Sequence, residues 1–101
     1  MVAHKRVPDA FQDTPLREAL ASYGVRHLVV IGMQTDICVN ATCRRAVSEG
    51  FDVTLVADGH TTADTASLSA AQIIANHNLA LGQLNGTEHP IAVRPRAAIT
   101  F

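Results

Sequence analysis

Apolar residues gather along the chain in short continuous runs that alternate with stretches of helical spacing. One continuous run covers residues 28–31, and a second, interrupted by Thr54, covers residues 53–57. Runs of this length are typical of strands in a parallel sheet that are buried on both faces. A shorter run at residues 91–93, just before Pro95, indicates a last strand. The pattern therefore predicts three strands, the first of them over residues 25–31.

The stretches of helical spacing are bounded by residues that begin or end helices. Thr14 is placed as an N-cap and Pro15 as the first helical residue, where a missing N–H costs nothing. Gly24 and Gly50 follow the first two stretches as C-terminal stops. Because helices and strands alternate through short links, we expect right-handed βαβ units and a parallel α/β sheet. The predicted helices cover residues 15–23, 36–49 and 65–81.

Length and charge restrict the class of protein. The 101 residues suffice for one small domain, and residues 1–13 form a polar, irregular segment that leads into it. The net charge is −1 and the eight basic residues are scattered, so we expect no nucleic-acid partner and no anionic membrane surface as partner. No apolar run is long enough to span a bilayer, and the first residues lack the apolar core of a signal peptide. We therefore expect a cytoplasmic protein whose thiols are reduced.

The first predicted strand ends in a polar turn, and Cys38 lies where the next helix begins. Thr35 or Asp36 is placed to cap this helix, so Cys38 falls in its first turn. Unpaired N–H groups and the positive end of the helix dipole favour an anion there, and a thiolate is such an anion. The same N–H groups are placed to hold the oxyanion that forms during acyl transfer. This arrangement suits a nucleophile, although a free cysteine is also often a small apolar packing residue.

The residues around Cys38 resemble the nucleophile segment of the isochorismatase-like cysteine hydrolases. Upstream of this segment, Lys5 stands six residues before Phe11, at the distance found in that family. The resemblance extends from Lys5 to Phe101, nearly the whole chain. The residues that carry it are Gly-Met-Gln-Thr-Asp-Ile-Cys-Val-Asn-Ala-Thr at 32–42, followed by Arg45-Ala46, Gly50-Phe51 and a strand that ends at Asp58, and preceded by Thr14-Pro15-Leu16 and Leu20.

The resemblance implies a fold and a domain boundary. The family's domain is a three-layer αβα Rossmann-like fold with a six-stranded parallel sheet, and it is about twice as long as this chain. We therefore interpret residues 1–101 as a single isochorismatase-like hydrolase domain that is truncated at its N-terminus. The chain is then the C-terminal half of the domain. Without the preceding strand, residues 28–31 become an apolar edge with unpaired N–H and C=O groups.

The resemblance also implies a reaction and the residues that perform it. It makes Cys38 the nucleophile and Lys5 the second member of an Asp, Lys, Cys catalytic set. It assigns the oxyanion hole to the backbone N–H groups of Gln34 and Cys38, beside a cis peptide bond between Met33 and Gln34. We predict hydrolysis of a small amide-like substrate at its C–N bond, through an acyl-enzyme on Cys38.

The catalytic aspartate of the family lies at the end of a strand ahead of Lys5, which this sequence does not contain. No other aspartate is at that position, so we expect the chain to be inactive alone. The alternative, from another class, is a catalytically dead interaction or oligomerisation module built from the same half-fold. A redox thiol protein is less well supported, because the chain has no Cys-x-x-Cys pair. The aspartates that this sequence does contain near the site, none of them at the position of the family's catalytic aspartate, are Asp9, Asp13, Asp36 and Asp58.

The expected partners are a small-molecule amide substrate and, in a full-length form, further copies of the same chain. We expect no cofactor and assign no metal ligand to these residues. By resemblance to nicotinamidases, metal ligands would lie in the half of the domain that this sequence does not contain.

Several further residues have both a functional and a plain structural interpretation. His60 and Thr35 are candidates for contact with substrate, but a solvated loop histidine is the more usual case for His60. Asp58 is expected to cap the turn after the second strand. Cys43 and Thr42 are expected to be packing residues of the second helix. The remaining histidines lack metal-ligand spacing and are interpreted as structural or exposed: His27, His77 and His89.

Overall fold

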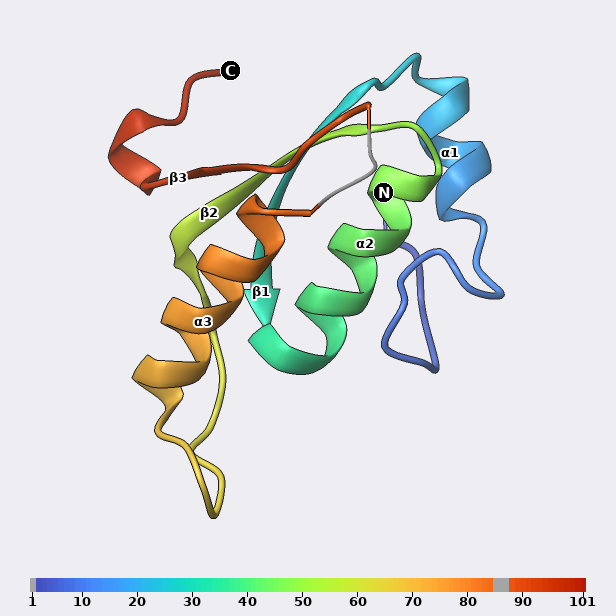
Figure 1. The fold of residues 1–101 in the computed structure, drawn as a ribbon. Coiled ribbons are helices and arrows are strands. Elements are labelled where there is room, and N and C mark those ends of the chain that lie inside the picture. The colour runs from blue at the N-terminus through green and yellow to red at the C-terminus, as the bar shows by residue number, and fades with distance from the viewer. Residues whose placement is uncertain (1, 85–87) are drawn as a thin grey trace.

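The computed structural model describes residues 2–84 and 88–101, and it confirms a parallel α/β sheet with flanking helices (Figure 1). The strands lie in the order β1-β2-β3, and both neighbouring pairs are parallel. Because the order follows the chain, each strand reaches its neighbour through a crossover that contains a helix. The strands are β1 (His27–Met33), β2 (Asp52–Thr61) and β3 (Ala92–Arg94).

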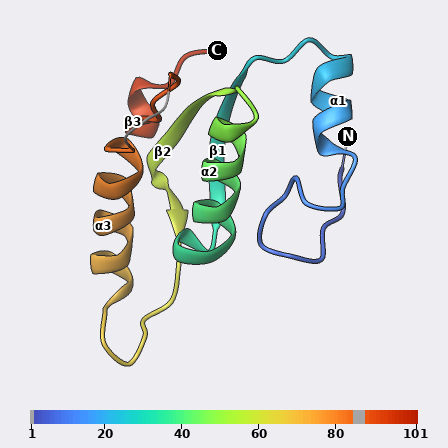
Figure 2. The ribbon, with the colours of Figure 1, turned by 45° about the vertical axis from the view of Figure 1, so that its right-hand side comes forward.

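Two helices cover one face of the sheet, and the C-terminal segment lies against the other. Figures 1 and 2 show α2 (Asn40–Ser48) and α3 (Ala70–Gly82) side by side, with α1 (Leu16–Ser22) beyond α2 at the flank. The C-terminal 3-10 turn, Arg96–Ala98, contacts β2. Ile99 after it lines a hollow over the opposite face of the sheet from α2 and α3.

The core forms where alternate strand residues meet the two helices. Val53 and Leu55 of β2 pack in one cluster with Cys43 and Ala46 of α2 and with Leu81 of α3. Cys43 is fully buried in this cluster, as the sequence pattern predicts. The packing fixes α2 against β2, so the turn that precedes α2 is held at the carboxyl end of the sheet.

β2 is longer than predicted, because it continues through residues that were expected in a turn. The expected strand ended at Ala57, and the structure carries β2 on to Thr61. Its register against β1 shifts on the way: Val30 lies opposite Leu55, and Gly32 lies opposite His60. The extra residues of β2 form an irregular bulge between these two pairs. The second half of β2 therefore runs beside the end of β1, next to the turn that carries Cys38.

β1 lies at an edge of the sheet, as predicted. Among the described strands it pairs with β2 alone. Its side chains Ile31 and Met33 are 66% and 63% exposed. The expectation of burial on both faces, drawn from the continuous apolar run, is therefore wrong for β1 in this chain, because Leu28 and Val30 pack against the core under α2 and α3 whereas Ile31 lies on the opposite face.

α3 begins at Ala70, later than the predicted start near Thr65. Ser69 is its N-cap, and its hydroxyl accepts a hydrogen bond from the N–H of Gln72. The Gln72 side chain accepts one from the N–H of Ser69 in return, which completes a capping box. Thr65 instead closes a turn, where its hydroxyl accepts from the N–H of Leu68 at 3.0 Å. The strong cap at Ser69 sets the start of the helix.

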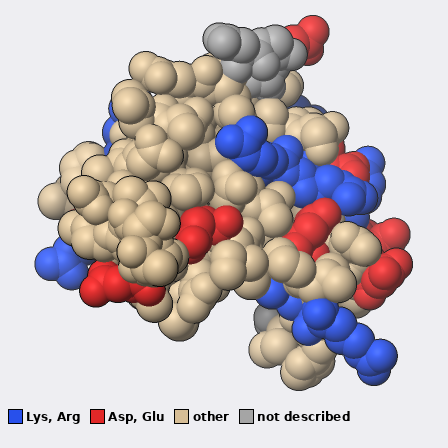
Figure 3. Space-filling view, turned by 60° about the horizontal axis from the view of Figure 1, so that its bottom comes forward, with Lys and Arg blue, Asp and Glu red and all other residues tan. Residues whose placement is uncertain are grey.

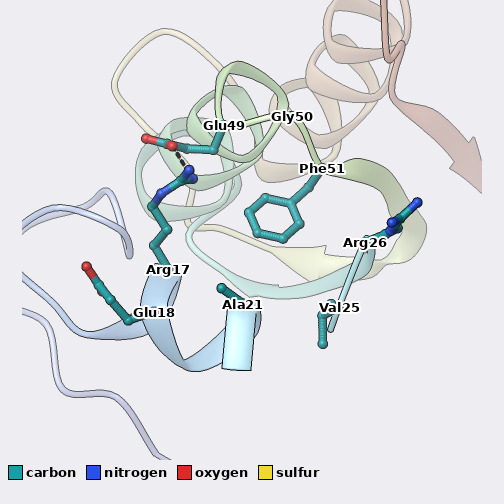
Figure 4. A pocket seen from close by; sticks show the side chains of 8 residues that line it. All are labelled: Arg17, Glu18, Ala21, Val25, Arg26, Glu49, Gly50 and Phe51. Carbon is teal, nitrogen blue, oxygen red and sulfur yellow. Dashed lines mark hydrogen bonds and ion pairs between the residues drawn. The ribbon is translucent and has the colours of Figure 1, made fainter. Parts of the chain in front are cut away.

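Charged side chains join α1 to α2. α1 begins at Leu16, one residue later than predicted, with Pro15 as its N-cap. Arg17 of α1 forms an ion pair with Glu49, which also accepts a hydrogen bond from Arg45 of α2. The hydrogen bond from Arg45 lowers the pKa of the Glu49 carboxyl. Figure 4 shows the bond between Arg17 and Glu49. Both side chains line a hollow of about 290 Å³ between α1 and the end of α2.

The surface shown in Figure 3 carries acidic and basic side chains that are interspersed, without a large area of one sign. The expectation that nucleic acid is not a partner stays a prediction. Within residues 2–84 and 88–101, no helix combines the length and the apolar character needed to cross a membrane.

Candidate active site

Cys38 lies in the turn that joins β1 to α2. This turn, Thr35–Val39, is wound as a π-helix and runs directly into α2, so Cys38 is at the start of the helical segment, as predicted. The peptide bond between Met33 and Gln34 is cis, as the resemblance implied. The carbonyl of Gln34 accepts hydrogen bonds from two N–H groups of the turn, each at 3.1 Å. The Cys38 thiol is half-buried at the carboxyl end of β1.

Lys5 lies against Cys38, although 33 positions separate them in the sequence. The Lys5 Nζ is 3.2 Å from the Cys38 Sγ and 3.1 Å from the carbonyl oxygen of Val7. A cation beside a half-buried sulfur at the start of a helical segment is placed to stabilise a thiolate. The structure therefore brings together the two side chains that the resemblance pairs. Their part in catalysis stays a prediction.

Thr42 fastens the segment that carries Lys5. Its hydroxyl accepts a hydrogen bond from the N–H of Ala10 at 3.0 Å and lies 3.3 Å from the carbonyl oxygen of Pro8, to which it donates. Both bonds run from α2 to the loop that follows Lys5. The sequence suggested only a packing role for Thr42, and the difference arises because the loop folds back over α2.

Two further contacts hold the same loop. Asp9 forms an ion pair with Arg45 of α2 at 3.0 Å. Phe11 is buried, and its ring lies 5.8 Å from that of Phe51 between centroids. These contacts were not predicted, since nothing local in the sequence pairs Asp9 with Arg45. They determine where the loop lies, and so where Lys5 can reach.

His60 is buried in the structure rather than solvated in a loop. Its side chain is 5% exposed, because β2 continues through it. The ring Nδ1 is 2.8 Å from the hydroxyl oxygen of Thr35, whose side chain is fully buried. The other ring nitrogen, Nε2, is 2.7 Å from the Oδ1 of Asn78 on α3. The expected solvated histidine is therefore wrong, and contact of His60 or Thr35 with substrate stays a prediction.

The two aspartates near the end of β2 and in the turn bind backbone and hydroxyl groups. Asp36 accepts a hydrogen bond from the Thr62 hydroxyl at 2.7 Å, and this bond lowers the pKa of Asp36. Asp58 accepts one from the N–H of Arg96 at 2.7 Å. Asp58 thus ties the C-terminal segment to β2 and does not cap a turn after it, because β2 does not end there.

No carboxylate oxygen within the described part of the chain is hydrogen-bonded to the Cys38 sulfur. The group that bonds to it is the Lys5 ammonium. Across the same residues, no three histidine, cysteine, aspartate or glutamate side chains gather in a way that could hold a metal ion. Among the described residues, the site therefore brings together a thiol, a cation and a turn of N–H groups, without a carboxylate bonded to the thiol.

We expect iodoacetamide to alkylate Cys38 and to leave Cys43 unmodified at about pH 8 in the folded chain. Burial raises the pKa of the Cys43 thiol to about 11, so this thiol stays protonated at that pH, and its side chain has no exposed surface. Tandem mass spectrometry of the peptide that contains both cysteines locates the adduct. Alkylation in concentrated urea, which exposes both thiols, is the control. Equal labelling of both cysteines in the folded chain would contradict the assignment of Cys43 to the core.

Comparison with known proteins gives a consistent set of matches. The family model for the isochorismatase domain matches residues 1–86 of this chain. A streptothricin hydrolase of Streptomyces noursei is 43% identical over 63 residues, which is 62% of this chain and 25% of that protein. Nicotinamidase 3 of Arabidopsis thaliana is 36% identical over 61 residues, which is 60% of this chain and 31% of that protein.

Solved structures that match share the fold over nine tenths or more of this chain. The crystal structure of an isochorismatase from Pseudomonas putida has a TM-score of 0.88 and 33% identity, and the match covers 99% of this chain and 51% of that one. This chain therefore spans about half the length of that structure, and less of the curated relatives.

Proposed function

The chain belongs to the isochorismatase family, and from this premise we propose that it is the nucleophile-bearing part of a hydrolase that cleaves the C–N bond of a small amide-like substrate. The observation that carries the proposal is the contact of 3.2 Å between the Lys5 Nζ and the Cys38 Sγ. The relatives named streptothricin hydrolase and nicotinamidase support hydrolysis of bonds of this kind. The substrate we propose is a small molecule that carries such an amide.

The proposed reaction begins with the Cys38 thiolate. Its sulfur attacks the carbonyl carbon, and the carbonyl oxygen becomes an oxyanion that the N–H groups of Gln34 and Cys38 stabilise. The C–N bond then breaks, the nitrogen leaves as an amine after it gains a proton, and the acyl group remains on sulfur as a thioester. Water attacks the thioester carbon and releases the carboxylic acid and the thiol. Lys5 stabilises the thiolate before the attack.

The amine leaving group explains why we propose that the 101-residue chain is inactive alone. An amide nitrogen departs only when it is protonated, and a group that removes the proton from the thiol is placed to deliver it to that nitrogen. No carboxylate of the described residues is bonded to the Cys38 sulfur, so none of these carboxylates is placed to perform this task. The proton carrier would then come from a segment or subunit outside it, and a homo-oligomer of a longer form is one such source.

An activated ester tests the nucleophile without the missing proton carrier, because p-nitrophenolate leaves without protonation. After incubation of the chain with p-nitrophenyl acetate, we expect one acetyl group on Cys38, located by tandem mass spectrometry. The Cys38→Ala variant should lose this adduct and keep any slow labelling of the N-terminal amine and of Lys5, the one lysine in the sequence. Acetylation that is equally fast in the variant would overturn the proposal.

The second candidate function is a non-catalytic association module, and the exposed edge β1 is the observation that favours it. Ile31 and Met33 leave apolar side chains in solvent beside unpaired strand groups. Such a module needs no activated thiol. An alkylation rate of Cys38 no greater than that of a cysteine in an unfolded peptide would favour this function over hydrolysis.

A further inference from the structure

We propose that His60, acting through the hydroxyl of Thr35, is a positioning residue that holds the oxyanion-binding turn in place. The inference rests on the proposed function, since it concerns the same turn and the same Cys38. It concerns two side chains that are buried beside the turn, since Thr35 is fully buried and His60 is 5% exposed.

The hydrogen bonds around His60 form a continuous chain from the sheet to the turn. The Asn78 amide nitrogen donates to the carbonyl of Ala57 at 3.1 Å, so the Asn78 Oδ1 faces the His60 Nε2 at 2.7 Å. An oxygen acceptor there requires a proton on Nε2. In the neutral ring, Nδ1 is then an acceptor, and the Thr35 hydroxyl donates to it at 2.8 Å. Both ring nitrogens of His60 therefore have hydrogen-bond partners, and the bonds run in one direction: Thr35 donates to His60, His60 donates to Asn78, and Asn78 donates to Ala57.

The turn needs this support because β1 is an edge strand. Thr35 is the first residue of the turn and directly follows Gln34, whose N–H is one of the two proposed oxyanion donors. The turn has no side-chain cap hydrogen bond, and it packs against α2, β1 and α3 as well as β2. Two side-chain hydrogen bonds tie the turn to this part of the chain: Thr35 with His60 of β2 and, one residue further on, Asp36 with Thr62, which directly follows β2. The extension of β2 beyond its bulge therefore serves as the scaffold on which the turn rests.

Acylation and alkylation of the same sulfur distinguish positioning from general stability. Attack on an ester carbonyl creates an oxyanion and needs correctly placed N–H groups, whereas displacement of iodide from iodoacetamide creates none. A turn that has shifted should slow acylation more than alkylation. Loss of stability without a change in the turn should alter neither rate in the folded protein. The ratio of the two rates is the informative quantity.

The structure provides a matched control in a second pair of threonine and histidine. The His27 Nε2 lies 2.7 Å from the Thr54 hydroxyl, Thr54 is 8% exposed, and the pair likewise joins β1 to β2. His27 is the first residue of β1, at the opposite end of the strand from the Cys38 turn. Removal of the Thr54 hydroxyl therefore costs a comparable hydrogen bond at a site remote from the sulfur.

The experiment measures acetylation by p-nitrophenyl acetate and alkylation by iodoacetamide at Cys38 in the chain and its variants. We expect Thr35→Val to lower the ratio of acylation to alkylation by about tenfold or more. Thr35→Ser, which keeps the hydroxyl, should restore the ratio to within about twofold, and Thr54→Val should leave it unchanged. His60→Phe provides a second variant with the same expected loss, in case Thr35→Val fails to fold by circular dichroism.

One outcome would overturn the positioning role of His60 alone, and another would overturn the proposed function as well. If Thr35→Val and His60→Phe keep the ratio of the unchanged chain, the positioning inference is overturned and the proposed function stands. If Cys38 in the unchanged chain is not acetylated faster than cysteine in an unfolded peptide, the proposed function fails and the inference with it.

Discussion

Cys38→Ala is expected to lower kcat/KM for amide hydrolysis by a factor of about 10⁴ or more in any active form of the protein. The variant has no atom that can form the acyl-enzyme, and direct attack by water would have to proceed without the thiolate that Lys5 stabilises. The measurement is release of ammonia or amine from a panel of small amides, made with a form of the protein that shows turnover.

Cys43→Ala is the matched control for this substitution. It removes the other thiol of the same helical segment, five positions further along, from a site with no exposed surface. We expect its kcat/KM to stay within about threefold of the parent value when the protein is folded. Retention of full activity in Cys38→Ala would contradict the assignment of Cys38 as the nucleophile.

Leu55→Ala is expected to cause the largest loss of stability, roughly 2–5 kcal/mol in the free energy of unfolding. Leu55 lies in the central strand β2, is fully buried, and packs against residues of both covering helices. A single small domain has only about 5–15 kcal/mol of stability in total, so the variant should be partly or wholly unfolded at room temperature. Urea unfolding followed by circular dichroism measures the change.

Leu79→Ala on α3 makes the same chemical change at a solvent-facing site. Leu79 is 58% exposed, so the substitution removes little buried surface and leaves no cavity. We expect a change of about 0.5 kcal/mol or less. Similar losses for the two variants would show that the core does not centre on Leu55.

The strands and their parallel arrangement could be predicted because each is a short apolar run between turn residues, and right-handed crossovers follow from the alternation with helices. The end of β2 could not be predicted from the sequence. The residues from Asp58 to Thr61 look like a polar turn on their own, and only pairing with β1 draws them into the sheet. The start of α3 had a local signal, the spacing of Ser69 and Gln72, which propensity near Thr65 obscured.

The candidate site divides in the same way. The position of Cys38 at a turn between strand and helix follows from local pattern, whereas its contact with Lys5 was implied by family resemblance and not by the residues alone. His60 was misjudged because its burial depends on the extension of β2. Asn78 gave no signal, since an asparagine within a helix acquires its role from the strand that packs against it.

The central claim is that Lys5 and Cys38 act as a pair, and the rate of Cys38 alkylation in Lys5→Met tests it most directly. Loss of the cation 3.2 Å from the sulfur should slow alkylation at neutral pH by about tenfold, because the thiolate is the reacting species. Arg6→Met, which removes the neighbouring exposed cation, should leave the rate unchanged. Equal rates in Lys5→Met and the unchanged chain would contradict the pairing on which the proposed hydrolase depends.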